Sequence, residues 1–225
     1  MFAGASDSRG GNERLGNADG RIHIVVADDH PVVRTGLAAV LEQQVDMDLV
    51  GEAENGARAV VLYREHRPDV CLMDLRMPVM EGVEAIRTII SEFPGARILA
   101  LTTYEGDADI RRALEAGARG YLLKDMLLTD VIGAVRAVHR GERVIPAAVA
   151  TRLAEFPDRS DLTERELQVL QLVARGLSNK EVARALGRTD ETVKIHLKNT
   201  FAKLNVADRT EAVTVALTRG LIHLD

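Results

Sequence analysis

The stretch VCLMDLRMPVMEG, residues 70–82, decides the fold of this chain. Its first four residues form a short apolar run, which predicts a strand buried on both faces, and the run ends at one carboxylate, Asp74. In open α/β sheets, ligands and reactive groups collect at the carboxyl ends of the strands. We therefore expect Asp74 to lie at the functional edge of a sheet.

Apolar runs of strand length alternate with helical patterns on both sides of this stretch. Further strands are predicted at 22–27, 49–53, 98–101 and 120–123, and the segments between and after them repeat with helical spacing. Five strands alternating with five helices predict a parallel sheet covered by helices on both faces. Such a sheet brings to one edge the polar residues that end its strands, namely Asp28, Asp29, Asp74, Thr102 and Lys124.

Size and composition favour two small domains. The chain has 225 residues, of which 46% are hydrophobic. Its single cysteine, Cys71, lies in a predicted strand and is expected to be a small core residue. Residues 1–20 are Gly-rich and predict a disordered tail. With neither a leader peptide nor an apolar run of about 20 residues, a cytoplasmic protein without a membrane partner is predicted.

The charge distribution differs between the two parts of the chain. Residues 21–140 carry 14 Lys+Arg against 19 Asp+Glu, a net charge of −5, whereas residues 141–225 carry 13 against 12, a net charge of +1. An acidic total argues weakly against nucleic-acid binding, but a local basic face matters more than the total.

The polar residues at the predicted edge suit phosphoryl chemistry. Three carboxylates held together repel one another and normally require a cation, for which Mg²⁺ fits best. Asp28 and Asp29 would bind the metal, while Asp74 would offer one oxygen to the metal and the other to a phosphoryl group. Lys124 would neutralise the phosphate, and the Thr102 hydroxyl would donate to it.

Each of these residues also has a plainer interpretation. Asp28 and Asp29 alone could cap a helix, Lys124 alone would be a solvated lysine, and Thr102 alone would be a turn residue. Their joint placement at the ends of strands one, three, four and five favours the phosphoryl site.

The motifs at these strand ends resemble those of a known family. Asp28-Asp29, Asp74-x-x-Met-Pro-x-x-x-Gly82, Thr102 and Gly120-Tyr121-x-x-Lys124 resemble the receiver domain of two-component response regulators over residues 22–140. The resemblance implies a flavodoxin-like (βα)5 fold in which Asp74 takes phosphate from a histidine kinase with Mg²⁺. It also implies that the backbone carbonyl of Arg76 binds the metal and that Tyr121 swings inward together with Thr102. Many receivers have proline after the lysine, where this chain has Asp125.

A phosphatase is the main enzymatic alternative. Haloacid-dehalogenase-type phosphatases also phosphorylate an aspartate at a strand end, but their general acid is an aspartate two residues later. That position is Arg76 here, which cannot supply a proton. We therefore expect self-phosphorylation and slow self-dephosphorylation, but no turnover enzyme.

After residue 140 the pattern becomes helical. Residues 141–161 are predicted to be a linker that includes a short helix near 147–156, and four helices are predicted at 164–175, 179–186, 190–204 and 208–219. Thr163-x-x-Glu166 and Ser178-x-x-Glu181 are capping-box signatures. A tight turn at Gly187-Arg188 joins the second and third helices, as a helix-turn-helix requires.

The helix predicted at 190–204 has two distinct faces. Val193, Leu197, Phe201 and Leu204 share one side and should face the core, which leaves the other side to Lys194, Ile195, Lys198 and Asn199. Lysines at such positions are often only a solvated face. A recognition helix needs this mixture, however, because lysines reach phosphates or guanine edges and an aliphatic group can meet a thymine methyl.

The second half of the chain resembles the LuxR-type helix-turn-helix over residues 162 to about 222. The motifs are Leu162-Thr163-x-Arg165-Glu166, GLSNKEVA at 176–183, Thr192-Val193-Lys194-x-His196 and Lys203-Leu204. With the receiver, they indicate a NarL/FixJ-type response regulator. The last helix of this family mediates dimerisation, so Val213 and Leu217 are candidates, although both are equally suited to the core. Arg188 departs from the usual small apolar residue and is expected to add a phosphate contact.

These observations predict a transcription regulator that is switched by phosphorylation. It has a receiver at 21–140, a DNA-binding domain at 162–225, and a histidine kinase, promoter DNA and a second copy of itself as partners. Activated dimers would bind half-sites about 10 base pairs apart. A phosphorylation-independent regulator, or a module that binds RNA or protein, remains an alternative from the sequence alone.

Overall fold

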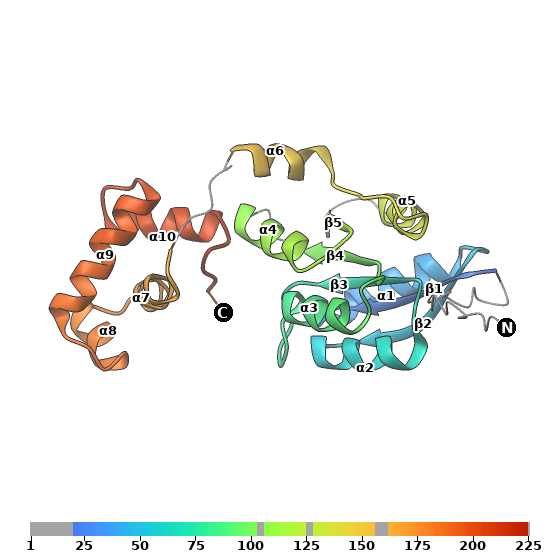
Figure 1. Cartoon of the computed structure of the whole chain (residues 1–225), viewed down its shortest axis with the longest axis horizontal. Helices are drawn as coiled ribbons and strands as arrows, with labels where there is room; N and C mark the ends of the chain where they lie inside the picture. The colour runs from blue at the N-terminus through green and yellow to red at the C-terminus, as the bar shows by residue number, and fades with distance from the viewer. Residues whose placement is uncertain (1–19, 103–105, 125–127, 156–161, 225) are drawn as a thin grey trace, which may run out of the picture.

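The computed structural model describes residues 20–102, 106–124, 128–155 and 162–224 (Figure 1). The tail predicted at 1–20 therefore lies, apart from Gly20, outside the described residues, as does Asp125. The first part of the chain alternates strands with helices, in the order β1 Ile22–Ala27, α1 Pro31–Glu42, β2 Met47–Ala53, α2 Gly56–His66, β3 Val70–Asp74, α3 Gly82–Glu92, β4 Ile98–Thr102, α4 Asp107–Glu115, β5 Gly120–Leu123 and α5 Leu128–His139.

The five strands form one parallel sheet in the order β2-β1-β3-β4-β5. The predicted parallel sheet is therefore confirmed. β2 begins two residues earlier than its apolar run, at Met47, which is fully buried in the core between the sheet, α1 and α5. β3 is buried at every position, including Cys71, as expected for a central strand covered on both faces.

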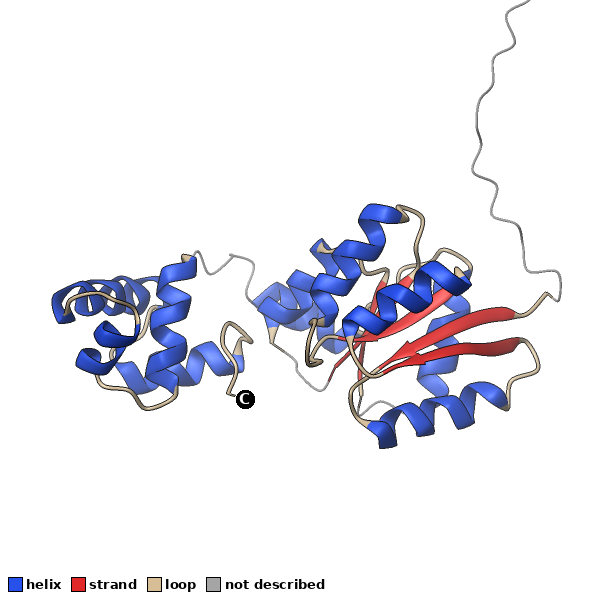
Figure 2. Ribbon diagram, turned by 90° about the horizontal axis from the view of Figure 1, so that it is seen from below, coloured by secondary structure: helices blue, strands red, loops and turns tan. Residues whose placement is uncertain are grey.

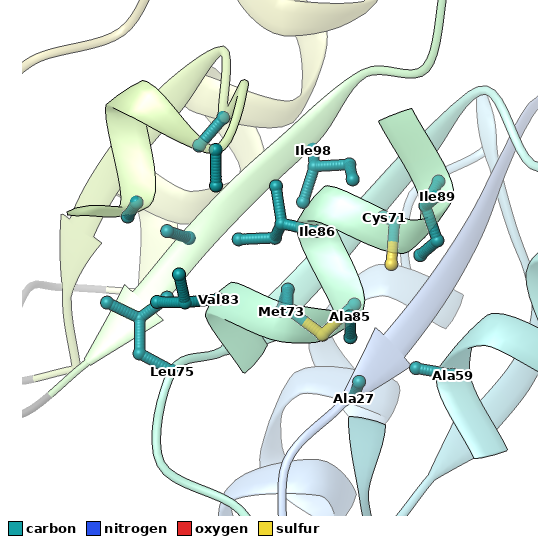
Figure 3. Close-up of a cluster of buried hydrophobic side chains, with 14 of the residues drawn as sticks. Ala27, Ala59, Cys71, Met73, Leu75, Val83, Ala85, Ile86, Ile89 and Ile98 are labelled. Carbon is teal, nitrogen blue, oxygen red and sulfur yellow. The ribbon is translucent and has the colours of Figure 1, made fainter. Parts of the chain in front are cut away.

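Helices cover both faces of the sheet (Figure 2). On one face, α2, α3 and α4 pack on side chains such as Cys71, Met73 and Ile98, and Figure 3 shows Ile86 of α3 in this cluster. On the other face, α1 and α5 pack through Leu37, Leu41 and Val135 on alternate residues of the same strands. The sheet is therefore the central layer of three, and only its edges and strand ends can carry a site.

A further helix, α6 Ala147–Glu155, lies within the segment predicted to be a linker. Val149 is 2% exposed and belongs to the core on the α4 face, and Leu153 packs against the same cluster. The structure thus packs this part of the predicted linker on the α/β unit. The periodicity predicts the helix, but not the neighbour that its apolar side covers.

The last part of the chain is helical, with α7 Glu164–Ala174, α8 Asn179–Ala185, α9 Asp190–Leu204 and α10 Arg209–Thr218. Val193 and Leu197 of α9 are buried with Val169 and Val182 of the two preceding helices. Thr189 caps α9 by accepting a hydrogen bond from the Thr192 amide. No helix in the described part of the chain is long and apolar enough to cross a membrane.

The capping box of α7 also fixes α9. Glu166 accepts a hydrogen bond from the Thr163 amide at 2.7 Å, and its Oε2 lies 2.8 Å from Lys203 Nζ of α9. The Glu166 side chain is 4% exposed, so its charge depends on these partners. Burial raises the pKa of Glu166, but the hydrogen bonds from Lys203 and Thr163 outweigh this effect and hold the pKa below its usual value.

Acid is therefore expected to destabilise the helical unit through Glu166. Because the folded-state pKa is depressed, this contribution to stability is present above the unfolded pKa of about 4.3 and is lost as the pH falls through the lower folded value. We expect Glu166→Gln to cost about 1–3 kcal/mol at pH 7 and to flatten the loss of stability below about pH 4.3. Urea unfolding of both proteins from pH 7 to pH 3 measures this, and parallel pH profiles would contradict it.

Candidate functional site

The register of the sheet brings the predicted polar residues to one edge. Ala27 of β1 pairs with Met73 of β3, so Asp28, directly after β1, and Asp74, the last residue of β3, lie at the same level of neighbouring strands. Thr102 pairs with Leu123, which places Lys124 directly after the pair. Asp28 and Asp74 are 0% and 2% exposed, which is rare for carboxylates without a charged partner.

Lys124 supplies that partner. Its Nζ lies 2.7 Å from Asp28 Oδ2 and donates to Asp74 Oδ2 at 2.8 Å. The Lys124 amide also donates to the Thr102 carbonyl oxygen at 2.7 Å, which fixes the backbone beyond β5. The ammonium group is thus held between the two carboxylates. Lys124 is therefore not the solvated surface lysine of the alternative interpretation.

The carboxylates also fit a divalent cation. Asp28, Asp29 and Asp74, together with His30, each offer a ligand atom, and these atoms lie within 4.8 Å of one another. Lys124 offsets one of the three negative charges, so a divalent ion would bring the cluster to neutrality. Oxygen ligands from carboxylates are those that Mg²⁺ prefers.

The alternative role of Asp28 and Asp29 as helix caps is not what the structure shows. His30 is the N-cap of α1, with no capping hydrogen bond from its side chain. Asp28 Oδ1 instead accepts from the His30 amide at 2.9 Å, and His30 Nδ1 lies 2.6 Å from Asp29 Oδ1. His30 was not predicted to be a site residue. The sequence feature that could have indicated it is its position directly after Asp28 and Asp29.

The electrostatic environment of Asp74 is set by burial and by Lys124. Burial raises the pKa of Asp74 above its usual range, while the hydrogen bond from Lys124 opposes the increase and Asp28 adds to it. The Arg76 amide approaches Asp74 Oδ1 at 3.3 Å. Lys124 is therefore the group that favours the anionic, nucleophilic form of Asp74.

Thr102 and Tyr121 lie beside this cluster. Thr102 is 1% exposed, and Tyr121 is fully buried and shares a hydrogen bond with Thr102. Burial, with a further contribution from Asp109, raises the pKa of Tyr121 above its usual range, so the ring stays neutral. Tyr121 therefore occupies an inward position in this structure.

The glycine of the Asp74 motif has a steric role. A Cβ on Gly82 would lie 1.9 Å from the Asp74 carbonyl oxygen, and the Gly82 amide donates to the Leu75 carbonyl oxygen at 3.0 Å. A side chain at this position would therefore push α3 away from the strand that carries Asp74.

The predicted recognition face is exposed on α9. Lys194, Ile195, Lys198 and Asn199 are all exposed, with Ile195 at 54%. Lys194 Nζ lies 3.0 Å from Asp190 Oδ2 on the same helix.

The other two sets of predicted residues lie outside this face. Arg188 is exposed in the turn before α9. Val213 and Leu217 of α10 are half-buried and pack against the helical core, as expected if they are core residues.

The fold and this site define a class. A five-stranded α/β unit with an acidic, lysine-bridged strand edge, followed by a helix-turn-helix unit, is the architecture of a DNA-binding response regulator. Two family models match the chain: the response regulator receiver domain over residues 24–136, and the bacterial regulatory proteins of the luxR family over residues 160–216. The chain belongs to the NarL/LuxR family of response regulators, and it is a phosphorylation-controlled transcription regulator of a two-component system.

Similar proteins share nearly the whole chain. The transcriptional regulatory protein LnrK of Bacillus subtilis is 40% identical over 216 residues, covering 89% of this chain and 98% of its own. The response regulator protein VraR of Staphylococcus aureus is 40% identical over 207 residues, covering 90% and 99%.

Two solved structures are also similar along most of their length. ChrA, a response regulator of a heme-sensing two-component system, has 38% identity and a TM-score of 0.55, covering 90% of this chain and 100% of its own. The RcsB–DNA complex has 28% identity and a TM-score of 0.63, covering 88% and 98%.

Proposed function

We propose that Asp74 is the phosphoacceptor through which this response regulator controls DNA binding. The observation that carries the proposal is the Lys124 ammonium group, held between Asp28 and Asp74 beside the carboxylate cluster. A carboxylate oxygen of Asp74 would attack the phosphorus of a phosphohistidine on the kinase. The phosphorus–oxygen bond forms as the phosphorus–nitrogen bond breaks, and the histidine leaves as a neutral imidazole after taking up a proton.

The neighbouring residues have complementary roles in this proposal. Mg²⁺, held by Asp28, Asp29, Asp74 and the Arg76 carbonyl oxygen, would neutralise charge on the transferring phosphoryl oxygens. Lys124 would exchange its contact with Asp74 Oδ2 for one with a phosphoryl oxygen, and Thr102 would donate to another. The phosphoryl group would stabilise the arrangement in which buried Tyr121 and Thr102 share a hydrogen bond. Water would later hydrolyse the acyl phosphate slowly.

We assign DNA binding, the activity that phosphorylation would control, to the helical unit. Lys194, Ile195, Lys198 and Asn199 would enter the major groove and Arg188 would contact a phosphate, since RcsB, a related regulator, is seen in complex with DNA. The structure of two RcsB dimers on DNA supports a homodimer, for which Val213 and Leu217 remain the proposed contacts.

The receiver is assigned to residues 21–140, the linker to 141–161 and the DNA-binding domain to 162–225. A regulator of promoter DNA is expected to act in the cytoplasm.

Intact mass and DNA selection test this proposal together. The full chain is incubated with Mg²⁺ and a small phosphodonor, and genomic fragments are then selected with phosphorylated and unphosphorylated protein. We expect a mass gain of one phosphoryl group and stronger enrichment of particular fragments by the phosphorylated form. A chain that gains no phosphate, or that enriches the same fragments equally in both states, would contradict the proposal.

A further inference from the structure

The imidazole ring of His30 lies against the carboxylate cluster. Its Nδ1 is 2.6 Å from Asp29 Oδ1 and 3.4 Å from Asp28 Oδ1. The His30 amide donates to the same Asp28 oxygen at 2.9 Å, so the backbone and the ring of one residue both approach that oxygen. The oxygen ligands proposed for Mg²⁺ leave this nitrogen atom without a role.

The local sequence explains why the ring is turned to the cluster. Pro31 begins α1 and restricts the residue before it to extended backbone, and His30 has a φ of −84° and a ψ of 109°. His30 is the N-cap of α1, but its side chain makes no capping hydrogen bond. The ring therefore does not serve the helix. Its side chain is 66% exposed, so an ion can reach it from solvent.

His30 and Lys124 contact different oxygens of the cluster. Lys124 Nζ lies 2.7 Å from Asp28 Oδ2 and 2.8 Å from Asp74 Oδ2. His30 lies instead beside Asp28 Oδ1, on the other oxygen of that carboxylate. The lysine and the imidazole therefore do not compete for the same oxygen atoms, and the cluster can use both.

The distances around His30 suit a shared metal ion. One ligand atom from each of Asp28, Asp29, His30 and Asp74 lies within 4.8 Å of the others. Two ligands at right angles around a small divalent ion, with bonds of about 2.1 Å, are about 3 Å apart. The separations of His30 Nδ1 from two carboxylate oxygens, 2.6 and 3.4 Å, lie on either side of this value. The imidazole nitrogen is therefore spaced as a fourth ligand of one ion.

We propose that His30 is a nitrogen ligand at the phosphoacceptor site and raises its affinity for divalent transition-metal ions such as Mn²⁺ and Co²⁺ relative to Mg²⁺. Imidazole binds such ions well, whereas Mg²⁺ prefers oxygen ligands and keeps several waters. The ring binds through Nδ1 as the neutral tautomer, with its proton on Nε2. The inference rests on the proposed function of Asp74 and deepens it, because it names the ions that the site takes.

Calorimetric titration of the full, untagged chain with Mg²⁺ and with Co²⁺, at one fixed pH, tests the proposal. His30→Ala should lower the affinity for Co²⁺ by roughly 10- to 100-fold, since even the outer partners of a metal ligand contribute this much, and leave the affinity for Mg²⁺ nearly unchanged. His30→Asn offers a carbonyl oxygen in place of the nitrogen. It should therefore bind Mg²⁺ like the native chain and lose the preference for Co²⁺.

A second histidine provides the matched control. His66, in the last turn of α2, is exposed and lies outside the cluster, so His66→Ala should leave both affinities native. Pulsed electron paramagnetic resonance of bound Mn²⁺ detects the ligand directly. Coupling to a nitrogen nucleus should be present in the native chain and in His66→Ala, and absent in His30→Ala.

The outcomes separate this inference from the function on which it rests. A native chain that takes up no phosphate with either ion refutes the role of Asp74, and the affinities still show whether His30 binds the metal. A phosphorylated native chain, together with native Co²⁺ affinity and nitrogen coupling in His30→Ala, overturns the role of His30 alone. Equal losses of Mg²⁺ and Co²⁺ affinity in His30→Ala also overturn it, because a residue that only supports Asp29 would weaken the site for every ion.

Discussion

Asp74→Asn is expected to abolish phosphorylation of the chain. The amide of asparagine is a poor nucleophile and carries no negative charge, so it neither attacks the phosphorus nor offers an anionic oxygen to Mg²⁺ or Lys124. Intact mass after incubation with Mg²⁺ and a small phosphodonor should show no added phosphoryl group. The phosphodonor should likewise leave the DNA affinity of the variant unchanged.

The same substitution is expected to leave the fold intact. Lys124 retains its contact with Asp28 at 2.7 Å, and removing the charge of Asp74 relieves repulsion between two buried carboxylates. Asp48→Asn is a matched control, because Asp48 is a half-exposed carboxylate paired with Arg21 outside the site. Phosphate uptake by Asp74→Asn equal to that of Asp48→Asn would refute Asp74 as the acceptor.

The strand-end residues were predictable because the geometry of a parallel sheet is general. Once β1, β3, β4 and β5 are recognised as parallel neighbours, Asp28, Asp74, Thr102 and Lys124 must converge. The sequence pattern contains this information since each apolar run ends abruptly at a polar residue. In the second half of the chain, the helical spacing of apolar residues likewise predicts the helices from local sequence. Thr163 and Glu166 form the capping box that their spacing predicts.

The contacts between distant segments were not predictable in this way. Asp107 and Asp109 suit the first turn of any helix, where they favour the positive end of its dipole. Only the folded chain shows that Arg219 and His223, more than 100 residues later, bind them. The burial of Val149 against the receiver core is a further example, since periodicity gives the apolar side of a helix but not its neighbour.

Lys194→Ala with Lys198→Ala is expected to weaken promoter binding by roughly tenfold or more, about 1.4 kcal/mol. Each lysine that neutralises a phosphate releases counterions, so each loss should lower the slope of log affinity against log salt by about 0.9. Lys194 contributes less to the free energy of binding than its charge suggests. It must first leave Asp190, 3.0 Å away, and that partner raises the pKa of Lys194 in the free protein. Lys198→Ala alone should therefore cost more affinity than Lys194→Ala.

A control with equal charge separates contact from long-range attraction. Arg58→Ala with Arg87→Ala removes two exposed positive charges from α2 and α3 of the receiver and lowers the net charge by the same amount. If the lysines touch DNA, only their loss lowers affinity and salt slope, because distant charges are screened beyond about 8–10 Å at physiological salt. Equal effects of the two double variants, measured by fluorescence anisotropy from 50 to 200 mM salt, would instead indicate general electrostatic attraction. In that case the exposed side of α9 would be only a solvated face, and DNA recognition would have to be assigned to another surface.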